Sequence, residues 1–273
     1  MLKYFISLLL LFKCISAFSQ GISNEYESDF AWHVKQVDEF IERFNNNDKT
    51  LVKLYSKKHD PPIILTREKL LKSLFNASGK NWNITDIESF INEVNSKKKQ
   101  VYINFFDKDW CAKLICSVDW KGKPGHVLLT LKIKKFPDES SKWVITGVNA
   151  KFLKQQRLTD SLANHTLRIM PAAKNHTTSL HPFSHATAFM NITQVSMDKI
   201  NIENYFEMPS KPQNDELLTF VNEIFNNRLL IKGTVSLSYE FYQVKGWTFE
   251  VRQYERQSQN SGWLISKLTQ RPI

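Results

Sequence analysis

The chain of 273 residues is poor in cysteine. It holds only Cys14, Cys111 and Cys116, which are too few and wrongly spaced for a disulfide scaffold or a zinc site. If Cys111 and Cys116 share one extended strand, their Cα atoms are about 16 Å apart, which is too far for a disulfide bond. An intrachain bridge between them therefore requires a turn.

Glycine is also scarce, with 8 residues, and none of them belongs to a nucleotide-binding or catalytic signature. The sequence has no phosphate-binding loop, no dinucleotide fingerprint and no Gly-x-Ser-x-Gly nucleophile elbow. An aromatic RNA-binding motif is absent as well. We therefore expect no cofactor, and nucleic acid is a disfavoured partner.

The N-terminus has the layout of a cleaved secretory signal over residues 1–19. Lys3 precedes an apolar run over residues 4–12, and residues 17–19 form a small-x-small cleavage site before Gln20. Lys13 interrupts the run, and about 18 uninterrupted apolar residues are needed to span a bilayer, so we expect no transmembrane anchor after cleavage. The sequence thus predicts an exported protein, either periplasmic or extracellular.

The charge is strongly basic. The formal net charge of +10 falls to +8 after cleavage, because the signal contains two lysines and no acidic residue. Such a surplus attracts polyanions, whether nucleic acid, anionic lipid or acidic glycans, through counterion release. The basic residues are spread along the chain, however, and only residues 97–99 form a lysine run. A solvated, lysine-rich surface is therefore the favoured interpretation.

Short patterns occur in the same order in both halves of the chain. The matching pairs are residues 90–94 (FINEV) with 220–224 (FVNEI), 143–148 (WVITGV) with 263–268 (WLISKL) and, more weakly, 66–70 with 196–200. The first and third pairs share an offset of about 130 residues, which indicates a duplication. We therefore predict an N-terminal domain over 20–153, a linker over 154–185 and a shorter C-terminal repeat over 186–273.

The first half is predicted to form helices followed by an antiparallel meander. Apolar residues at helical spacing predict a helix over 29–46, Thr66 is placed to cap a second helix, and residues 85–88 form a capping box for a third. The period then changes to two, which predicts strands over 101–105, 114–120, 127–133 and 143–148. This order is typical of an α+β fold with helices on one face of the sheet.

The second half repeats this plan in shorter form. Helices are predicted over 197–206 and 215–226, and strands over 235–241 and 249–251. Gly246 is predicted to turn the chain, and residues 260–262 (Asn-Ser-Gly) are predicted to lead into the last strand. Each half then ends on a tryptophan-bearing strand, and we expect Trp143 and Trp263 to lie in the core.

This element order, a starting helix over 33–44 and a final W-x-I-x-x-V strand resemble the NTF2-like, or cystatin-like, superfamily of cone-shaped α+β domains. The resemblance implies two tandem domains, each with helices packed on a curved antiparallel sheet and often enclosing a pocket. Catalytic members place an Asp–His pair in that pocket, and no such pair maps onto matching motifs here. The resemblance therefore implies a fold and a cavity without an activity.

Three tryptophans near predicted strand ends or turns, Trp110, Trp120 and Trp247, are the candidate ligand-binding residues. An exposed indole ring stacks on sugar rings and on apolar ligands. The same rings become core residues if the fold buries them, so their exposure decides between the two interpretations.

Two further groups have simpler structural explanations. Asp107, Asp109 and Asp119 offer carboxylates for acid–base chemistry, but the first two are equally typical of a turn between strands. The second group is His165, His176, His181 and His185. His181 and His185 have metal-like spacing, yet Pro182 disfavours the regular helix that would bring them together. We favour loop histidines without a metal.

The sequence thus predicts a non-catalytic binding or assembly module that recognises a small ligand, a glycan or an envelope protein through a pocket or a sheet face. The alternative is a pocket enzyme of the NTF2-like type, an isomerase, dehydratase or hydrolase. It requires a histidine within hydrogen-bond reach of Asp107, Asp109 or Asp119 inside a cavity.

Overall fold

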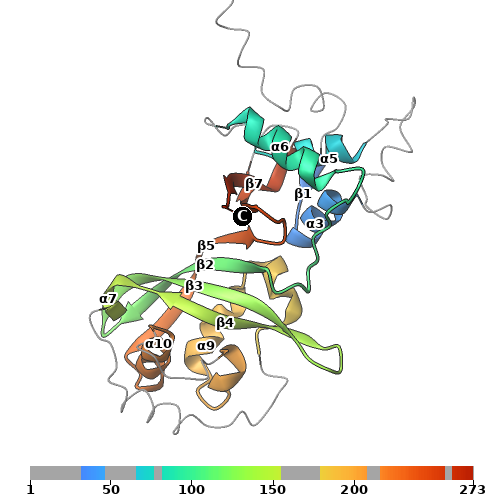
Figure 1. Cartoon of the computed structure of the whole chain (residues 1–273). Coiled ribbons are helices and arrows are strands. Elements are labelled where there is room, and N and C mark those ends of the chain that lie inside the picture. The colour runs from blue at the N-terminus through green and yellow to red at the C-terminus, as the bar shows by residue number, and fades with distance from the viewer. Residues whose placement is uncertain are drawn as a thin grey trace, which may run out of the picture. The chain divides into compact units, whose positions relative to one another are not determined.

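Figure 1 shows the computed structural model, which describes residues 32–46, 66–76, 82–154, 179–207, 216–255 and 260–272. The chain forms two compact units: unit 1 comprises residues 1–103 and 253–270, and unit 2 comprises residues 104–252 and 271–273. Each unit takes residues from both predicted halves, so separate tandem domains over 20–153 and 186–273 are not confirmed. The predicted signal, His165, His176 and most of the predicted linker lie outside the described residues.

The fold is α+β, as predicted. Unit 1 contains β1 (Trp32–Val34), α3 (Val37–Asn45), α5 (Arg67–Ser73), α6 (Ile84–Val94) and β7 (Asn260–Gln270). Unit 2 contains β2 (Trp110–Trp120), β3 (Lys123–Lys135), β4 (Ser141–Asn149), α7 (Lys151–Lys154), η2 (Pro182–Thr187), η3 (Met190–Thr193), α9 (Gln194–Met197), η4 (Ile202–Tyr205), α10 (Glu216–Phe225), β5 (Leu229–Phe241) and all but the last two residues of β6 (Trp247–Tyr254). No described helix is long and apolar enough to cross a membrane.

The helices of unit 1 begin where polar side chains cap them. Thr66 caps α5 as predicted, because its hydroxyl accepts a hydrogen bond from the Lys69 N–H at 3.3 Å. Helix α6 begins earlier than its predicted capping box, since the Asn83 side chain accepts from the Thr85 N–H at 3.1 Å. Helix α3 begins only at Val37, because strand β1 occupies part of the segment predicted to be helical.

A buried arginine joins the ends of three segments in unit 1. Arg67 is 6% exposed, and its guanidinium donates to the carbonyls of Phe44 at 3.4 Å, Val94 at 3.0 Å and Val101. Asn45 forms a reciprocal pair with the backbone of Ile103, at 2.7 and 2.9 Å. Residues 101–103 therefore satisfy much of their backbone without a neighbouring strand, and the strand predicted over 101–105 is wrong.

Strand β7, near the C-terminus, forms backbone hydrogen bonds with segments of unit 1 that lie far from it in the sequence. It pairs in parallel with β1, and its Ile265 exchanges backbone hydrogen bonds with Leu74 at 2.7 Å and Asn76 at 3.0 Å. Gly262 lies opposite Val34 with a φ of +88°, and a Cβ atom there would lie 2.0 Å from the Val34 carbonyl oxygen. Residues 260–262, which were predicted to lead into the last strand, are themselves part of β7, and Gly262 permits the close approach to β1.

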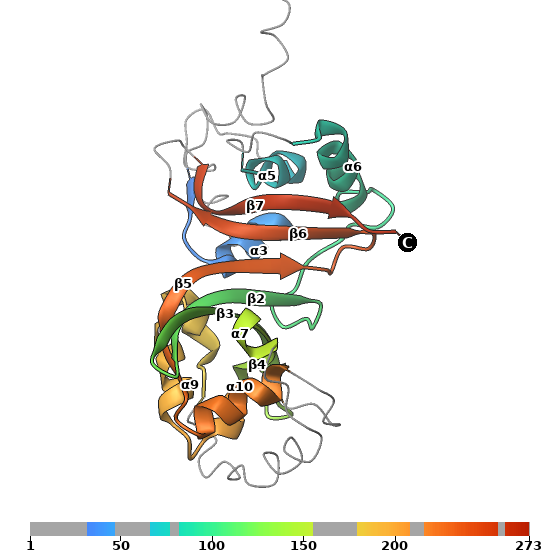
Figure 2. The same cartoon turned by 90° about the vertical axis from the view of Figure 1, so that its left-hand side faces the viewer.

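The sheet of unit 2 is antiparallel, with the strand order β6-β5-β2-β3-β4. Side chains of β2 alternate, so that Ala112, Leu114 and Cys116 are buried beneath the helices. Figures 1 and 2 show α9 and α10 on the same side of this sheet. Strand β5 pairs with β2 along its whole length but leaves Lys232 and Val235 out of register as β-bulges.

The segment predicted as a helix over 197–206 is divided into α9 and η4. Asp198 leaves the helical conformation, with φ −93° and ψ 77°, and its carboxylate accepts from Asn201 and from the Tyr205 hydroxyl. This competition of an aspartate side chain with the helical backbone is a common reason for a helix to end. The neighbouring α9 lies against β5, where the Ile231 N–H donates to Ser196 Oγ at 3.0 Å.

We predict that Gly262→Ala destabilises the protein by at least about 2 kcal/mol, because an alanine is strained at positive φ and its Cβ meets the backbone of β1. Gly122→Ala is the matched control, since Gly122 has a φ of +76° with nothing within 4 Å of the added Cβ. Thermal unfolding followed by circular dichroism measures both. Equal losses for the two variants would contradict the close approach of β1 and β7.

Candidate functional site

Trp120, a predicted ligand contact, is held by three neighbours at the end of β2. Its indole Nε1 donates to Glu223 Oε2 at 2.9 Å, and its ring stacks on Phe152 with 4.9 Å between centroids. The Lys121 ammonium lies 4.6 Å from the centroid of the same ring, within range of a cation–π interaction. Trp120 is only partly exposed, so its part in ligand binding stays a prediction.

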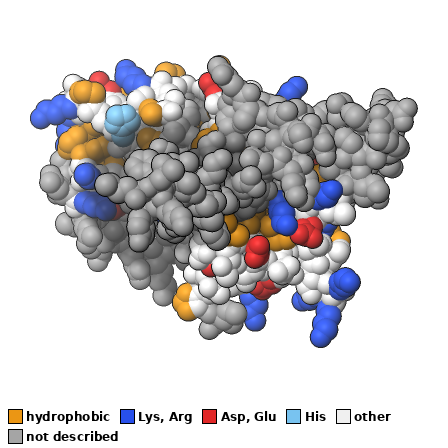
Figure 3. All heavy atoms as spheres, turned by 90° about the horizontal axis from the view of Figure 1, so that it is seen from above, with side chains coloured by type: hydrophobic (Ala, Val, Ile, Leu, Met, Phe, Trp, Pro, Cys, Tyr) orange, Lys and Arg blue, Asp and Glu red, His pale blue; other side chains and the backbone are white. Residues whose placement is uncertain are grey.

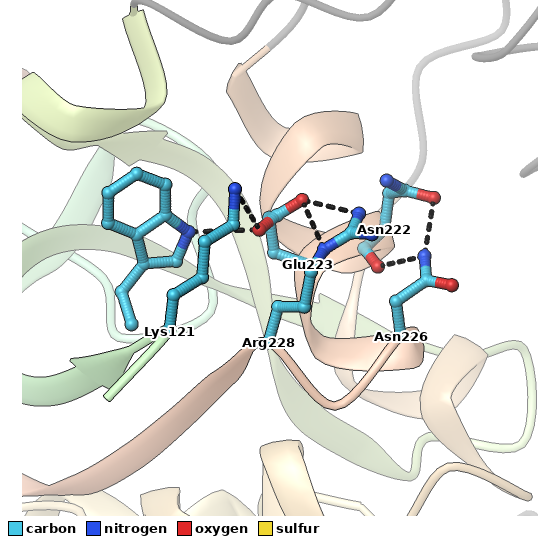
Figure 4. A network of polar contacts seen from close by, with 6 residues as sticks. Lys121, Asn222, Glu223, Asn226 and Arg228 are labelled. Carbon is cyan, nitrogen blue, oxygen red and sulfur yellow. Dashed lines mark hydrogen bonds and ion pairs between the residues drawn. The ribbon is translucent and has the colours of Figure 1, made fainter. Parts of the chain in front are cut away.

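The centre of this cluster is Glu223, on the last turns of α10 (Figure 4). Its side chain is 3% exposed, and Arg228 donates to Oε1 through Nε at 3.1 Å and through a terminal nitrogen at 2.6 Å. The Lys121 ammonium lies 4.0 Å from Oε2. Both oxygens of the buried carboxylate are therefore engaged, and two cations compensate its charge.

Backbone hydrogen bonds fix the residues that surround Glu223. The Arg228 N–H donates to the Glu223 carbonyl at 2.8 Å, and the Lys121 N–H donates to the Arg228 carbonyl at 2.8 Å. One turn of α10 is further tied by Asn226, whose Nδ2 donates to the Asn222 carbonyl at 2.7 Å (Figure 4). The cluster thus links the β2–β3 turn, α10 and the start of β5. The cluster therefore stabilises the packing of these three segments, and the saturated Glu223 carboxylate has no free oxygen for a reaction.

Trp110 and Trp247 begin strands β2 and β6, as their position near strand ends predicted, but the structure buries both to 2% exposure. The Trp110 ring stacks on Phe241 at 5.1 Å, and its Nε1 donates to the Phe105 carbonyl at 2.8 Å. Of the two interpretations left open for these rings, burial favours the core over ligand binding, because neighbouring aromatic residues cover the strand ends. The core positions predicted for Trp143 and Trp263 are confirmed, at 0% and 4% exposure.

Two of the three candidate carboxylates, those of Asp107 and Asp119, accept hydrogen bonds from backbone N–H groups near the two ends of β2. Asp107 Oδ1 accepts from the Asp109 N–H at 2.8 Å, and Asp119 Oδ1 accepts from the Gly122 N–H at 2.9 Å. Among the described residues, no histidine contacts any of the three. These contacts do not form the Asp–His pair that the enzymatic alternative requires.

Of the two described histidines of the candidate metal group, His181 is the N-cap of η2 and His185 lies in its last turn. His181 Nδ1 accepts from the Phe183 N–H at 3.2 Å, while His185 is 4% exposed with Nδ1 2.9 Å from the Pro182 carbonyl. Pro182 opens a 3-10 helix instead of a regular α-helix, in agreement with the prediction. Within the described ranges, no group of histidine, cysteine and acidic side chains is arranged to hold a metal ion.

Cys111 and Cys116 are free thiols on opposite faces of β2. Burial raises the pKa of the Cys111 thiol, and it raises that of Cys116 to about 12. A thiol acts as a nucleophile only when it is deprotonated, so both residues are poor candidates for covalent catalysis.

The face of the unit 2 sheet opposite the helices is the second candidate site. We call it the open face and define it by Lys113, Ile115 and Ser117 of β2 with their partners in register: Thr130, Leu128 and His126 of β3, and Ser238, Ser236 and Gly233 of β5. Ile115 is 38% exposed and pairs with the partly exposed Leu128. The other residues of the open face are polar apart from Gly233, and Lys113 lies 3.7 Å from Glu240.

Basic side chains are scattered in the view of Figure 3, where lysine and arginine lie among hydrophobic and acidic groups. The Lys97–Lys99 run is exposed in the segment after α6, beyond the end of the helix itself. This distribution fits the predicted solvated surface. Sequence reasoning missed Glu223, although an acidic residue between the apolar Val221 and Ile224 of α10 was a usable signal of a buried ion pair.

We predict that Glu223→Gln lowers the free energy of unfolding by about 2 kcal/mol, because the amide cannot accept from Trp120 and pair with Arg228 at full strength. Urea unfolding followed by tryptophan fluorescence measures the loss. Glu207→Gln removes an exposed carboxylate from the same unit and is expected to cost less than about 0.5 kcal/mol. A loss of unfolding free energy for Glu223→Gln as small as that of the control would show that the cluster does not stabilise the fold.

Comparison of this chain with protein-family models, with curated proteins and with solved structures gives no match. The fold class and the contacts around Glu223 and on the open face are therefore the grounds on which a function is proposed.

Proposed function

We propose that this protein is an exported, non-catalytic binding or assembly module that recognises a partner protein through the open face. The observation that carries the proposal is the apolar pair Ile115 and Leu128 within a polar surround. Protein interfaces have this anatomy, with an apolar centre that loses its water on binding and a rim that keeps polar contacts. An antiparallel sheet with one face packed on helices leaves its other face accessible, so a partner protein can bind there.

Two residue groups distinguish this proposal from the enzymatic alternative. The carboxylates of Asp107 and Asp119 accept backbone hydrogen bonds, and the buried carboxylate of Glu223 is saturated by its partners. A general base needs a carboxylate that is free to reach a substrate proton. These contacts favour a binding role over an acid–base role, and no described contact favours the enzyme.

The NTF2-like kinship forms part of the proposal as well. It is supported by the repeated segments, because residues 90–94 and 220–224 are helical in α6 and α10, and residues 143–148 and 263–268 are extended in β4 and β7. The open face would then correspond to the outer side of a curved sheet, with the helices of unit 2 on the inner side.

Export predicts that the mature chain begins at Gln20. Expression in a bacterium with a periplasm, followed by fractionation and intact mass spectrometry, should find a periplasmic chain that lacks residues 1–19. Leu9→Arg places a charge in the apolar run and is expected to leave the chain unprocessed in the cytoplasm. A wild-type chain that keeps Met1 in the cytoplasmic fraction would contradict export.

Recognition through the open face predicts a position-specific contact. A photo-crosslinking amino acid at position 115 should give one discrete adduct in the native compartment, whereas the same group at Lys151, exposed on α7 of unit 2, should not. Crosslinked species are separated by mass and identified by peptide sequencing. Equal labelling at both positions, or none at position 115, would contradict the proposal.

A further inference from the structure

The β3–β4 hairpin gathers lysines that lie apart from the open-face pair Ile115 and Leu128. Lys132, Lys134 and Lys135 end β3, and Lys142 lies near the start of β4. We call these four residues the hairpin lysines. The only acidic residues within 132–142 are Asp138 and Glu139, in the turn that joins the two strands. The hairpin therefore carries more lysines than acidic residues. These lysines are spread over eleven positions of the sequence, and the pairing of β3 with β4 brings them close together.

Two of the hairpin lysines are held close together. Lys134 and Lys142 are direct partners in the antiparallel register, and their ammonium groups lie 6.0 and 5.4 Å from the centroid of the same Phe136 ring. Like charges that face each other on neighbouring strands are unfavourable, and the ring offsets only part of the repulsion. Burial, and then the charge of Lys134, lower the pKa of Lys142. An anion placed between the two ammonium groups would relieve this repulsion.

None of the hairpin lysines forms an ion pair with a described carboxylate. Lys132 donates to the Lys108 carbonyl at 3.2 Å and Lys142 to Asn204 Oδ1 at 3.3 Å. The Asp138 carboxylate accepts instead from Ser140, at 2.6 and 3.1 Å. By contrast, Lys113 of the same sheet is paired with Glu240. The positive charge of the hairpin is thus left for an external anion.

Aromatic rings lie beside the same lysines. The Lys135 ammonium is 5.8 Å from the ring of Phe106, which is 52% exposed, and Phe136 is partly exposed. Such rings offer a flat apolar surface to the C–H faces of sugars. All four cations are lysine, whereas the planar fork of arginine is the group that favours phosphate and nucleic acid. The combination fits a polymer that alternates carboxylates with apolar ring faces.

We infer that the hairpin lysines, with Phe106 and Phe136, form a binding surface for a carboxylate-bearing polysaccharide. The polymer's carboxylates contact the ammonium groups of Lys134 and Lys142, and its sugar rings lie on the aromatic side chains. This inference goes beyond the proposed function, because it concerns a second surface and a different class of partner. It depends on neither the open face nor signal cleavage.

The test measures binding of the mature chain to alginate, a polyuronate, by calorimetry at about 0.1 M salt. Dextran is the neutral polymer control, and a single-stranded oligonucleotide of equal charge represents the rival partner. We expect saturable binding of alginate, no binding of dextran, and weaker binding of the oligonucleotide. Absence of alginate binding, or tighter binding of the oligonucleotide, would overturn the inference.

Two double variants of equal charge locate the site. Lys134→Gln with Lys142→Gln should weaken alginate binding about tenfold, since two ionic contacts are lost. Lys97→Gln with Lys98→Gln removes two exposed lysines from unit 1 and should change the affinity less than about twofold. Equal losses in both variants would show that net charge alone drives the binding and would overturn the assignment.

Thermal unfolding checks that the Lys134→Gln, Lys142→Gln variant is folded. Its unfolding midpoint temperature should not fall, because the substitutions remove a repulsion between Lys134 and Lys142. Phe106→Ser keeps all four cations and removes the exposed ring. This single variant should weaken alginate binding about threefold without altering the salt dependence of binding. An unchanged affinity would remove Phe106 from the surface and contradict the sugar-stacking part of the inference.

Discussion

Strand β2 pairs along its length with β3 on one side and β5 on the other, and the architecture of unit 2 depends on this double constraint. The eleven residues of β2 face thirteen residues of β5, so the longer strand must bulge, at Val235 and at Lys232. The bulges let β5 bury residues at both of its ends, where Ile231 and Phe241 join the core, while Val235 between them is exposed. Pairing of β2 on both sides also fixes which of its residues face the helices and which form the open face.

Buried polar groups connect the helices to their surroundings in each unit. Arg67 in unit 1 is satisfied by backbone carbonyls, and Glu223 in unit 2 by an indole N–H and a guanidinium. Neither charge can be buried without these partners, because the cost of removing an ion from water exceeds what packing returns. Both groups therefore select one arrangement of the segments that they join, which apolar packing specifies less strictly.

The two surfaces proposed for recognition rely on different physical effects. The open face has an apolar pair, Ile115 and Leu128, whose contribution to binding comes from the removal of water and depends little on salt. The hairpin lysines act through charge, so their contribution is screened as ionic strength rises. On these two proposals, one chain would hold a protein partner and an acidic polymer through contacts that respond independently to the surrounding solution.

The sequence by itself determined the α+β class, most helices and strands, and the core positions of Trp143 and Trp263, because apolar periodicity and capping are local signals. The repeated segments 90–94 and 220–224 are both helical, in α6 and α10. The weaker pair differs in structure, because Thr66 caps α5 whereas Ser196 lies inside α9. Only the tertiary structure decided that Trp110 and Trp247 are buried, that residues 101–105 form no strand, and that Lys134 meets Lys142. Each of these outcomes depends on which distant segment lies against the residue, and hydrophobic pattern carries no information about the identity of that neighbour.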